Sequence, residues 1–511
     1  MTERTTPGAD GTKNWLRRIL SKLDVRANHG DVIAGEVGEG ARGVVIGKNI
    51  VQIGTLKVPL LPLLLVPLIL IGGFAAAFFA IRGPTRMDGS FNVAVAEFGQ
   101  EQLSGRVVSS REGELLSKWV YESLVGQKEA ARNSNSVDPD IISSLESLEI
   151  WQDTLPITEK GTRIGVVKNE VDAPELANRL GAQVLIYGNI DPQGNFTPRF
   201  YVSPLVHSGT DQIIGHYSLG NTPVPINSTA LDFAINKVAD RTDPLLWLAV
   251  GLRQEQLGFA PEALDAFGRA VNAVEDQEGA DIIYYFSGDA ALFLAQQQTG
   301  FNEDLASRSE DAFTEALQIN PQSFRAHVGI AAVNLYRAKN EHHLNLEASK
   351  PFLDKAIQES QLALQLTSSS PDQELKVLAT LALAQTQYFL GAANYQVRRF
   401  EEAEAAFNQA IQMLEGISPE LAGGSAPRIT GLVYQTMGTV YKQMAQIYEI
   451  TGENEQSLDF YRQARDAYAL CIEQGKAGVF DEILTGTIIR KFCVPQDAES
   501  AKAMQLLQGG Q

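Results

Sequence analysis

The apolar residues of this chain follow three different spacings, and these divide it into regions. Residues 58–81 are continuously apolar, with no charged residue among twenty-four. Residues 88–221 mix short apolar runs with segments in which apolar residues recur every three or four positions. From residue 242 to residue 474 only the helical spacing remains. The pattern predicts an α+β multidomain protein: a transmembrane helix, a small mixed-sheet α/β domain and an α-helical solenoid.

The apolar stretch 58–81 predicts a single transmembrane helix. As a helix it would reach about 36 Å, enough for a hydrocarbon core of about 30 Å. Lys57 and Arg82 bracket it, and three prolines, the first of them Pro59, predict a kink or a later start of the helix. A cleaved signal peptide fits less well, because the apolar run is too long and 57 mostly polar residues precede it.

The distribution of basic residues predicts an orientation for this helix. Nine lysines and arginines precede the stretch, and only Arg82 and Arg86 follow it before acidic residues begin. The positive-inside rule then places residues 1–57 in the cytoplasm as a tail and residues 82–511 outside it. Counted over the near flanks alone, the bias is three basic residues against two. The sequence thus predicts a single-pass membrane protein.

Two features of the tail invite a functional interpretation. Apolar residues between Trp15 and Leu23 have helical spacing with basic residues among them, typical of a helix that lies on anionic lipid or of a solvated helix. Gly38–Gly43 satisfies G-x-G-x-x-G, but dinucleotide binding requires a helix to begin at the third glycine. The residues that follow, Val44–Ile50, are strand-like, so we expect short β-segments separated by glycine turns.

The domain expected after the apolar stretch has its elements in the order β-α-β-α-β-β-β. The first strand is the buried run Phe91–Phe98, and helices are predicted over Glu112–Val125 and Ala173–Leu180. The last two strands, Phe196–Val202 and Ile213–Leu219, alternate as an antiparallel pair does. This order indicates one mixed sheet with helices packed on a face.

Three segments of this domain carry a family resemblance. Val93–Phe98 (VAVAEF), Ala177–Ile190 (ANRLGAQVLIYGNI) and the hairpin Phe196–Leu219 resemble the TolB-like amino-terminal domain, over about 130 residues. The resemblance implies an interaction or sensing module of the bacterial envelope, without catalysis, placed between a membrane anchor and tetratricopeptide repeats.

Composition and motifs argue against several functions. The net charge of -19 repels polyphosphate, so we expect no nucleic-acid partner. The sequence contains no G-x-S-x-G or H-E-x-x-H, and His207 and His216 lack a further ligand at metal-binding spacing. We therefore predict no enzyme, no cofactor and no metal site. The two cysteines, Cys471 and Cys493, could form one bridge, but we favour two buried thiols.

Residues 242–474 carry the tetratricopeptide-repeat (TPR) pattern, with a bulky residue at repeat position 4, small residues at positions 8, 20 and 27 and an aromatic residue at position 24. Three registers match it: Trp247, Gly251, Ala263, Phe267 and Ala270; Gly391, Ala403, Phe407 and Ala410; Tyr441, Ala445, Ser457, Tyr461 and Ala464. Two further repeats are stretched by predicted connections at Gln296–Ser309 and Asn340–Lys350. The chain is identified as a member of the TPR family, with about five repeats and a C-terminal cap and tail over residues 475–511.

Membership of this family implies a superhelix whose first helices line a concave groove for an extended or helical segment of a partner. Positions 2, 5, 9 and 12 face inward in the family and give the candidate groove residues: Leu248, Leu252, Tyr388, Tyr395, Lys442, Gln446 and Glu449. Some members clamp a C-terminal carboxylate, but here Gln446 stands where asparagine is expected and the other basic residues are missing. An aromatic groove favours a peptide bound by stacking and hydrogen bonds, unless Tyr388 and Tyr395 only pack between helices.

Together these features predict a membrane-tethered scaffold or adaptor that binds a partner polypeptide through its TPR array. The alternative is a membrane receptor subunit that senses a small ligand through the α/β domain. Against it, a tail of residues 1–57 is too short to hold a signalling enzyme.

Overall fold

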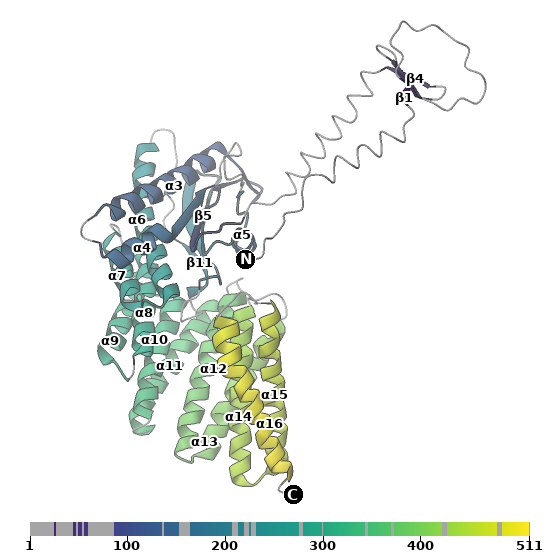
Figure 1. Cartoon of the computed structure of the whole chain (residues 1–511). Helices are drawn as coiled ribbons and strands as arrows, with labels where there is room; N and C mark the ends of the chain where they lie inside the picture. The colour runs from purple at the N-terminus through teal and green to yellow at the C-terminus, as the bar shows by residue number, and fades with distance from the viewer. Residues whose placement is uncertain are drawn as a thin grey trace, which may run out of the picture. The chain divides into compact units, whose positions relative to one another are not determined.

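The structure is a computed structural model of the chain (Figure 1). It describes four short strands near the N-terminus and then residues 86–134, 137–152, 164–206, 213–218, 224–225, 231–274, 279–298, 300–342, 346–368, 373–421, 427–477 and 483–509. The chain divides into two compact units, Met1–Gly83 and Pro84–Gln511, and each is described by itself.

The described part of the first unit is a small sheet. Its strands are β1 (Val25–Arg26), β2 (Val44–Ile46), β3 (Ile50–Ile53) and β4 (Leu56–Pro59), in that order across the sheet. β2 and β3 are antiparallel. The short β-segments predicted here are confirmed, and a strand, not a helix, follows the glycine motif. The helix predicted over residues 15–23 lies outside the described residues.

The prediction of a single-pass membrane protein is contradicted. In the described part of the chain, no helix combines the length and the apolar character needed to cross a membrane. Val58 and Pro59, which begin the predicted span, belong to β4 and pair with β3. A branched Cβ favours extended backbone, and proline breaks a helix interior, so the local chemistry opposed a helix here. Residues 60–81 lie outside the described residues. The predicted orientation of the chain depended on the membrane span and is therefore withdrawn with it.

The second unit begins with a mixed sheet in the order β11-β10-β9-β5-β8. β5 is parallel to β8 and β9, whereas β9, β10 and β11 are antiparallel, as predicted for the closing strands. The strands are β5 (Phe91–Val95), β6 (Gly99–Glu101), β7 (Val107–Val108), β8 (Leu148–Gln152), β9 (Val184–Ile190), β10 (Asn195–Val202), β11 (Gly215–Ser218) and β12 (Val224–Pro225).

Helices cover both faces of this sheet, not one. α3 (Arg111–Arg132) and α4 (Pro139–Ser147) share a hydrophobic core with Val93 of β5, while α5 (Asp172–Leu180) packs in a second core with Ala94. Successive strand residues point to opposite faces, and all five residues of β5 are buried. A continuous apolar strand is typical of a sheet covered on both sides, so the prediction of a single covered face is wrong.

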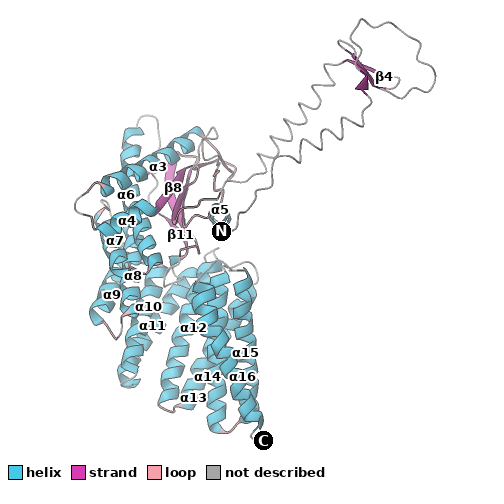
Figure 2. Cartoon of the chain, in the orientation of Figure 1, coloured by secondary structure: helices cyan, strands magenta, loops and turns pink. Residues whose placement is uncertain are grey.

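The rest of the second unit is a row of antiparallel helix pairs, which makes the protein mostly helical (Figure 2). The pairs are α6 (Leu231–Leu257) with α7 (Ala260–Asn272), α8 (Ala280–Gln297) with α9 (Glu303–Ile319), α10 (Phe324–His342) with α11 (Leu346–Thr367), α12 (Gln373–Gln396) with α13 (Phe400–Leu421) and α14 (Pro427–Thr451) with α15 (Asn454–Ala477). A π-helix, η2 (Ile483–Cys493), and α16 (Val494–Gly509) follow. This is a TPR-like helical repeat.

The predicted small and aromatic positions explain why the helices approach closely. Phe313 of α9 is fully buried, and its ring lies against two glycines of neighbouring first helices. A Cβ at Gly288 would lie 2.8 Å from that ring, and a Cβ at Gly329 would lie 2.5 Å from it. In two pairs the serine at position 20 donates its hydroxyl proton to the carbonyl at position 8: Ser309 to Gly288 at 2.7 Å and Ser457 to Ala445 at 2.9 Å.

The long connections predicted inside two repeats are wrong. α8 continues to Gln297 and α9 begins at Glu303, so most of the inserted residues lengthen the two helices. Likewise, α10 continues to His342 and α11 begins at Leu346. Asn302 fixes the start of α9, because its side chain accepts a hydrogen bond of 3.0 Å from the Leu305 amide.

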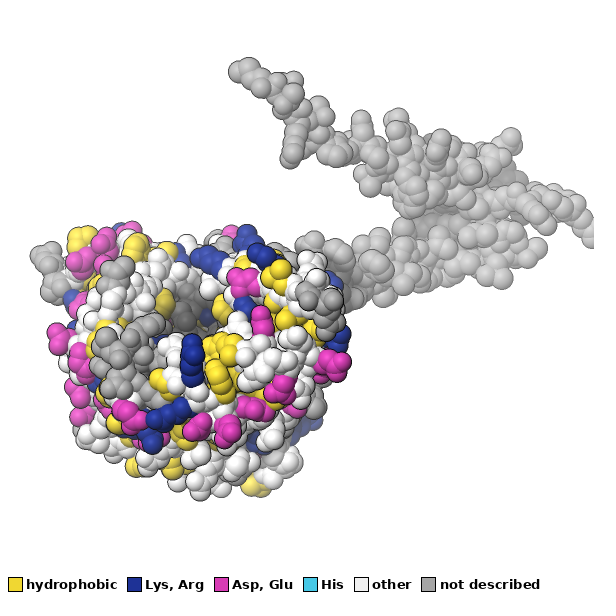
Figure 3. All heavy atoms as spheres, turned by 90° about the horizontal axis from the view of Figure 1, so that it is seen from below, with side chains coloured by type: hydrophobic (Ala, Val, Ile, Leu, Met, Phe, Trp, Pro, Cys, Tyr) yellow, Lys and Arg dark blue, Asp and Glu magenta, His cyan; other side chains and the backbone are white. Residues whose placement is uncertain are grey.

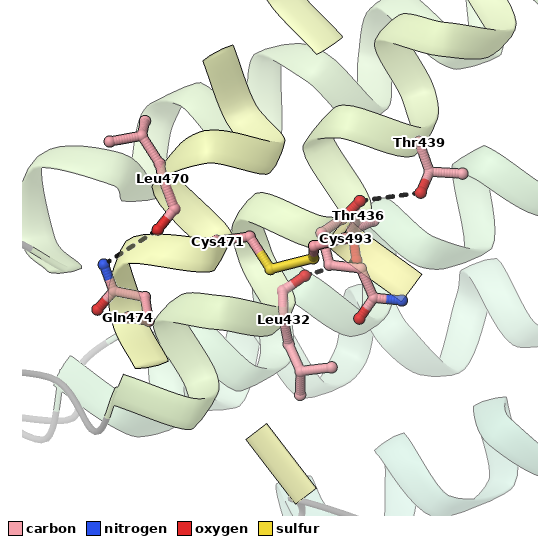
Figure 4. The surroundings of a disulfide bond; sticks show 8 residues. Leu432, Thr436, Thr439, Leu470, Cys471, Gln474 and Cys493 are labelled. Atoms are coloured by element: carbon pink, nitrogen blue, oxygen red, sulfur yellow. Dashed lines mark hydrogen bonds between the residues drawn. A yellow bond between two sulfur atoms is a disulfide. The ribbon is translucent and has the colours of Figure 1, made fainter. Parts of the chain in front are cut away.

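Cys471 and Cys493 form a disulfide, so the interpretation of two free thiols is wrong (Figure 4). The bond joins α15 to the end of η2 across 22 residues of sequence, and both side chains are fully buried. Closing a loop of this size restricts the unfolded chain and stabilises the folded one by about 3 kcal/mol. The segment after the last helix pair is thereby fastened to the array.

Candidate functional site

The sheet and the first two helix pairs share one hydrophobic core. Phe200 of β10 stacks on Tyr217 of β11 with ring centroids 4.8 Å apart, and Tyr217 lies 5.1 Å from Phe286 of α8. Phe286 in turn lies 5.8 Å from Phe267 of α7. Aromatic rings at such separations attract each other beyond the gain from their burial. The protein's own sheet therefore covers this part of the helical array.

Two of the candidate groove residues belong to this core. Leu248 and Leu252 of α6 are fully buried in the same cluster as Phe200 and Tyr217. In this arrangement neither side chain is open to a partner. Their apolar character was the available signal, since a solvent-filled groove is rarely lined with leucines.

Two buried arginines, which the sequence analysis missed, attach the segment between β10 and β11 to the array. Arg325 of α10 donates from Nη2 to the Ile214 carbonyl at 2.8 Å, and its guanidinium carbon lies 4.6 Å from the Tyr217 ring centroid. Arg428 of α14 donates from Nη1 to the Val206 carbonyl at 3.4 Å. In the sequence, each of these arginines stands near the start of an otherwise apolar first helix, which could have indicated a buried contact. These contacts extend the closed part of the array from α6 to the N-terminal ends of α10 and α14.

A cluster of polar side chains is buried at the same junction. Glu255 of α6 and Asp289 of α8 are 3% and 2% exposed. Burial raises the pKa of Glu255 well above its usual range, and the neighbouring Asp289 carboxylate raises it further. Burial likewise raises the pKa of Tyr285, which lies between them in sequence and near Arg325 in space. An uncharged Glu255 carboxyl is the form that this environment favours.

The candidate tyrosines of α12 lie partly between helices. The Tyr388 ring is 6.0 Å from Phe407 of α13, and the Tyr395 ring is 5.9 Å from Phe400. Both tyrosines are half-buried, and burial raises the pKa of each. Each ring thus contributes to helix packing and still presents part of its surface, and its role in binding a peptide stays a prediction.

The candidate residues of α14 have internal partners or neighbours. Lys442 donates to the Gln496 side-chain oxygen at 2.6 Å and pairs with Glu499 at 2.5 Å, both on α16, and its side chain is 13% exposed. Glu449 accepts a hydrogen bond of 3.0 Å from the Tyr461 hydroxyl and lies near enough to Tyr395 to raise its pKa. Gln446, one turn before Glu449, is half-buried. The structure therefore brings Tyr395 and Glu449 together and turns Lys442 toward α16.

Seen from below, the helical unit encloses a hollow (Figure 3). Hydrophobic and basic side chains show on its wall, whereas acidic side chains gather along the outer edge of this face. A hollow of this kind between helix pairs is where a TPR-like array can hold an extended chain.

The structure adds little about metal ions or catalysis. Within the described ranges, no three histidine, cysteine, aspartate or glutamate side chains are grouped so that they could hold a metal ion. His216 Nδ1 lies 2.8 Å from the Tyr187 hydroxyl, and His207 lies outside the described residues. The absence of a cofactor and of an enzymatic activity stays a prediction.

Comparisons with known proteins give a limited result. No protein-family model matches the chain, and no curated protein matches it. Among solved structures, a thermophilic TPR protein of Thermus thermophilus is 15% identical, with a TM-score of 0.29, over 48% of this chain and 98% of its own. A signal transduction ATPase with numerous domains and a TPR sensor, from Pyrococcus horikoshii, is also 15% identical, with a TM-score of 0.28, over 55% of this chain.

The chain spans 42% of the length of the second of these proteins. Nothing in these comparisons supports the TolB-like resemblance, the membrane anchor or the alternative of a membrane receptor.

Proposed function

We propose that this protein is an interaction scaffold that binds an extended segment of a partner protein along the inner face of α12 and α14. The observation that carries the proposal is the TPR-like stack of helix pairs, in which the sheet and the segment after β10 close part of the array while one face of the molecule stays hollowed. Residues 88–221 and 242–474 would then act together, with the sheet as an end wall.

The side chains available along this path favour neutral recognition. Tyr395 and Gln446 offer a partly exposed aromatic face and an amide. Lys442 is already paired with Glu499, so it cannot also hold a partner's carboxylate in this arrangement. Stacking on tyrosine and hydrogen bonding to an amide suit a peptide with apolar and uncharged polar side chains.

A site-specific cross-linking experiment tests the proposal. A photo-crosslinking amino acid is placed at Gln446 of α14 in the full chain, and in a control at Gln409, which is exposed on α13, the second helix of its pair. The proposal expects one partner segment to be captured from Gln446 and not from Gln409. A synthetic peptide of that segment should then bind the full chain, and Tyr395→Ala should weaken this binding without changing the circular dichroism spectrum. Equal capture from both positions would refute the proposal.

A further inference from the structure

The junction between the sheet and the first two helix pairs contains a buried acid that the described residues leave without a hydrogen bond. Glu255 is 3% exposed, and neither of its carboxyl oxygens has a hydrogen-bond partner among the described residues. An ionised carboxylate without hydrogen bonds is strongly disfavoured in a low-dielectric interior. The closed junction therefore favours the protonated, uncharged form of Glu255.

Among the described residues, the neighbouring charge that shifts the pKa of Glu255 is a second acid, Asp289. α8 contributes Asp289, a second acid that is 2% exposed, and Tyr285, whereas β11 contributes Tyr217. α10 contributes Arg325, whose guanidinium is bound to the Ile214 carbonyl and lies over the Tyr217 ring.

On the α4 side the nearest described contact belongs to the neighbouring Gln254, which donates to the Asp140 carbonyl at 3.1 Å. Two carboxyl groups that share a buried site cannot both ionise at low cost, so one proton is retained between Glu255 and Asp289.

We propose that this junction is a proton-dependent latch: the sheet stays on the inner face of α6 and α8 while Glu255 is protonated, and it separates from them as Glu255 ionises. Separation would expose Phe286, whose ring packs against Phe200 and Tyr217, and so lengthen the inner face open to a partner. The inference concerns the closed end of the array and does not depend on the partner site proposed at α12 and α14.

The direction of the pH dependence follows from burial. Burial raises the pKa of Glu255 in the closed junction above its value in the open one, so the closed form binds one more proton. The resulting stability is fully present below the usual glutamate pKa of 4.5 and is lost as the pH rises toward the raised value. Across that window the closing equilibrium constant should fall about tenfold per pH unit.

Hydrogen–deuterium exchange of the full chain tests the latch between about pH 5 and pH 9, the range over which buried glutamates are known to titrate. Protection factors, corrected for intrinsic exchange, are followed for β10, β11, α6 and α8. We expect them to fall with rising pH in the wild-type protein and to stay level in Glu255→Gln. Glu315→Gln, an exposed glutamate of α9, is the matched control and should follow the wild type.

The exchange of α13 and α15 distinguishes a latch from general unfolding, because these helices belong to a separate hydrophobic core. Their protection should not change over the same range. Equal pH slopes in the wild type and Glu255→Gln, or a parallel loss of protection in α13 and α15, would overturn the proposal. If Glu255→Gln does not fold, Asp289→Asn keeps the glutamate and removes the negative charge beside it, which lowers the pKa of Glu255. The fall in exchange protection should then be complete at a lower pH than in the wild type. An unchanged end point would also overturn it.

Discussion

Replacing Phe313 with alanine tests whether close ring-to-glycine packing holds neighbouring helix pairs together. The Phe313 side chain is fully buried between Gly288 of α8 and Gly329 of α10, and its ring centroid lies 5.8 Å from that of Tyr285. Phe→Ala substitutions in cores cost about 3–5 kcal/mol, because the lost burial is joined by a cavity. Two glycines line the site and have no side chain that could move into the space, so the upper half of that range is expected.

The assay is equilibrium unfolding in urea followed by circular dichroism, with Phe259→Ala as a control. Phe259 precedes α7 and is 50% exposed, so its loss should cost only about 1 kcal/mol. If Phe313→Ala costs no more than the control, the ring is not what holds α8, α9 and α10 together, and the reasoning fails.

A double substitution isolates the contact itself. Gly329→Ala alone should cost about 1–3 kcal/mol, because its new Cβ would lie 2.5 Å from the Phe313 ring. In the absence of that ring the same Cβ would occupy part of the cavity, so Phe313→Ala with Gly329→Ala should cost clearly less than the sum of the two. Simple additivity would show that the two positions do not touch in solution.

Four further results are expected. Reducing the disulfide between α15 and η2 should lower the free energy of unfolding by about 3 kcal/mol, measured by urea unfolding with and without reductant. Glu310→Gln should cost about 1 kcal/mol near neutral pH. Burial raises the pKa of Glu310, but hydrogen bonds from Lys355 and Arg337 outweigh burial, and the pKa is lowered overall. The stability given by these hydrogen bonds is therefore present above the usual glutamate pKa of 4.5 and is lost as the pH falls below it. Thermal unfolding at neutral and at acid pH should therefore show a difference from wild type at neutral pH alone. Gly215→Ala should destabilise by about 1–3 kcal/mol, because φ is 122° there and the Cβ would lie 2.6 Å from the Arg325 guanidinium. Gly268 lies in a helix, and a Cβ added there would have no neighbouring atom within 4 Å. Gly268→Ala should therefore stabilise the protein by about 1 kcal/mol.

The features that could be predicted from the sequence are those set by residues close together along the chain. The contact between Gly251 and the Phe267 ring lies within one helix pair, and both residues were assigned from their spacing alone. The strands and helices of the sheet domain were likewise read from short apolar runs and helical spacing. Local periodicity reflects which side of an element is buried, and this is decided mostly by the element itself.

Features that depend on distant residues were missed. Leu248 was assigned to an open groove by its repeat position, yet it is buried in a core that also contains Phe200 and Tyr217, two residues of the domain that was predicted separately. The covered second face of the sheet was missed for the same reason. The membrane assignment failed differently, because hydropathy was weighed above the proline at position 59, which lies in β4.

The core that the sheet shares with the helices changes which part of the TPR-like array is open to a partner in this protein. An array with both ends open would need polar residues along its whole inner face, whereas here α6 and α8 present leucines, aromatic rings and two buried acids to a sheet of the same chain. Apolar residues make that contact stable, but Glu255 and Asp289 add no stability that leucine could not give. Two carboxyl groups in such a place lower the stability of closure as the pH rises. The residues that distinguish this junction from an ordinary hydrophobic core are therefore the ones that make its closure depend on a proton.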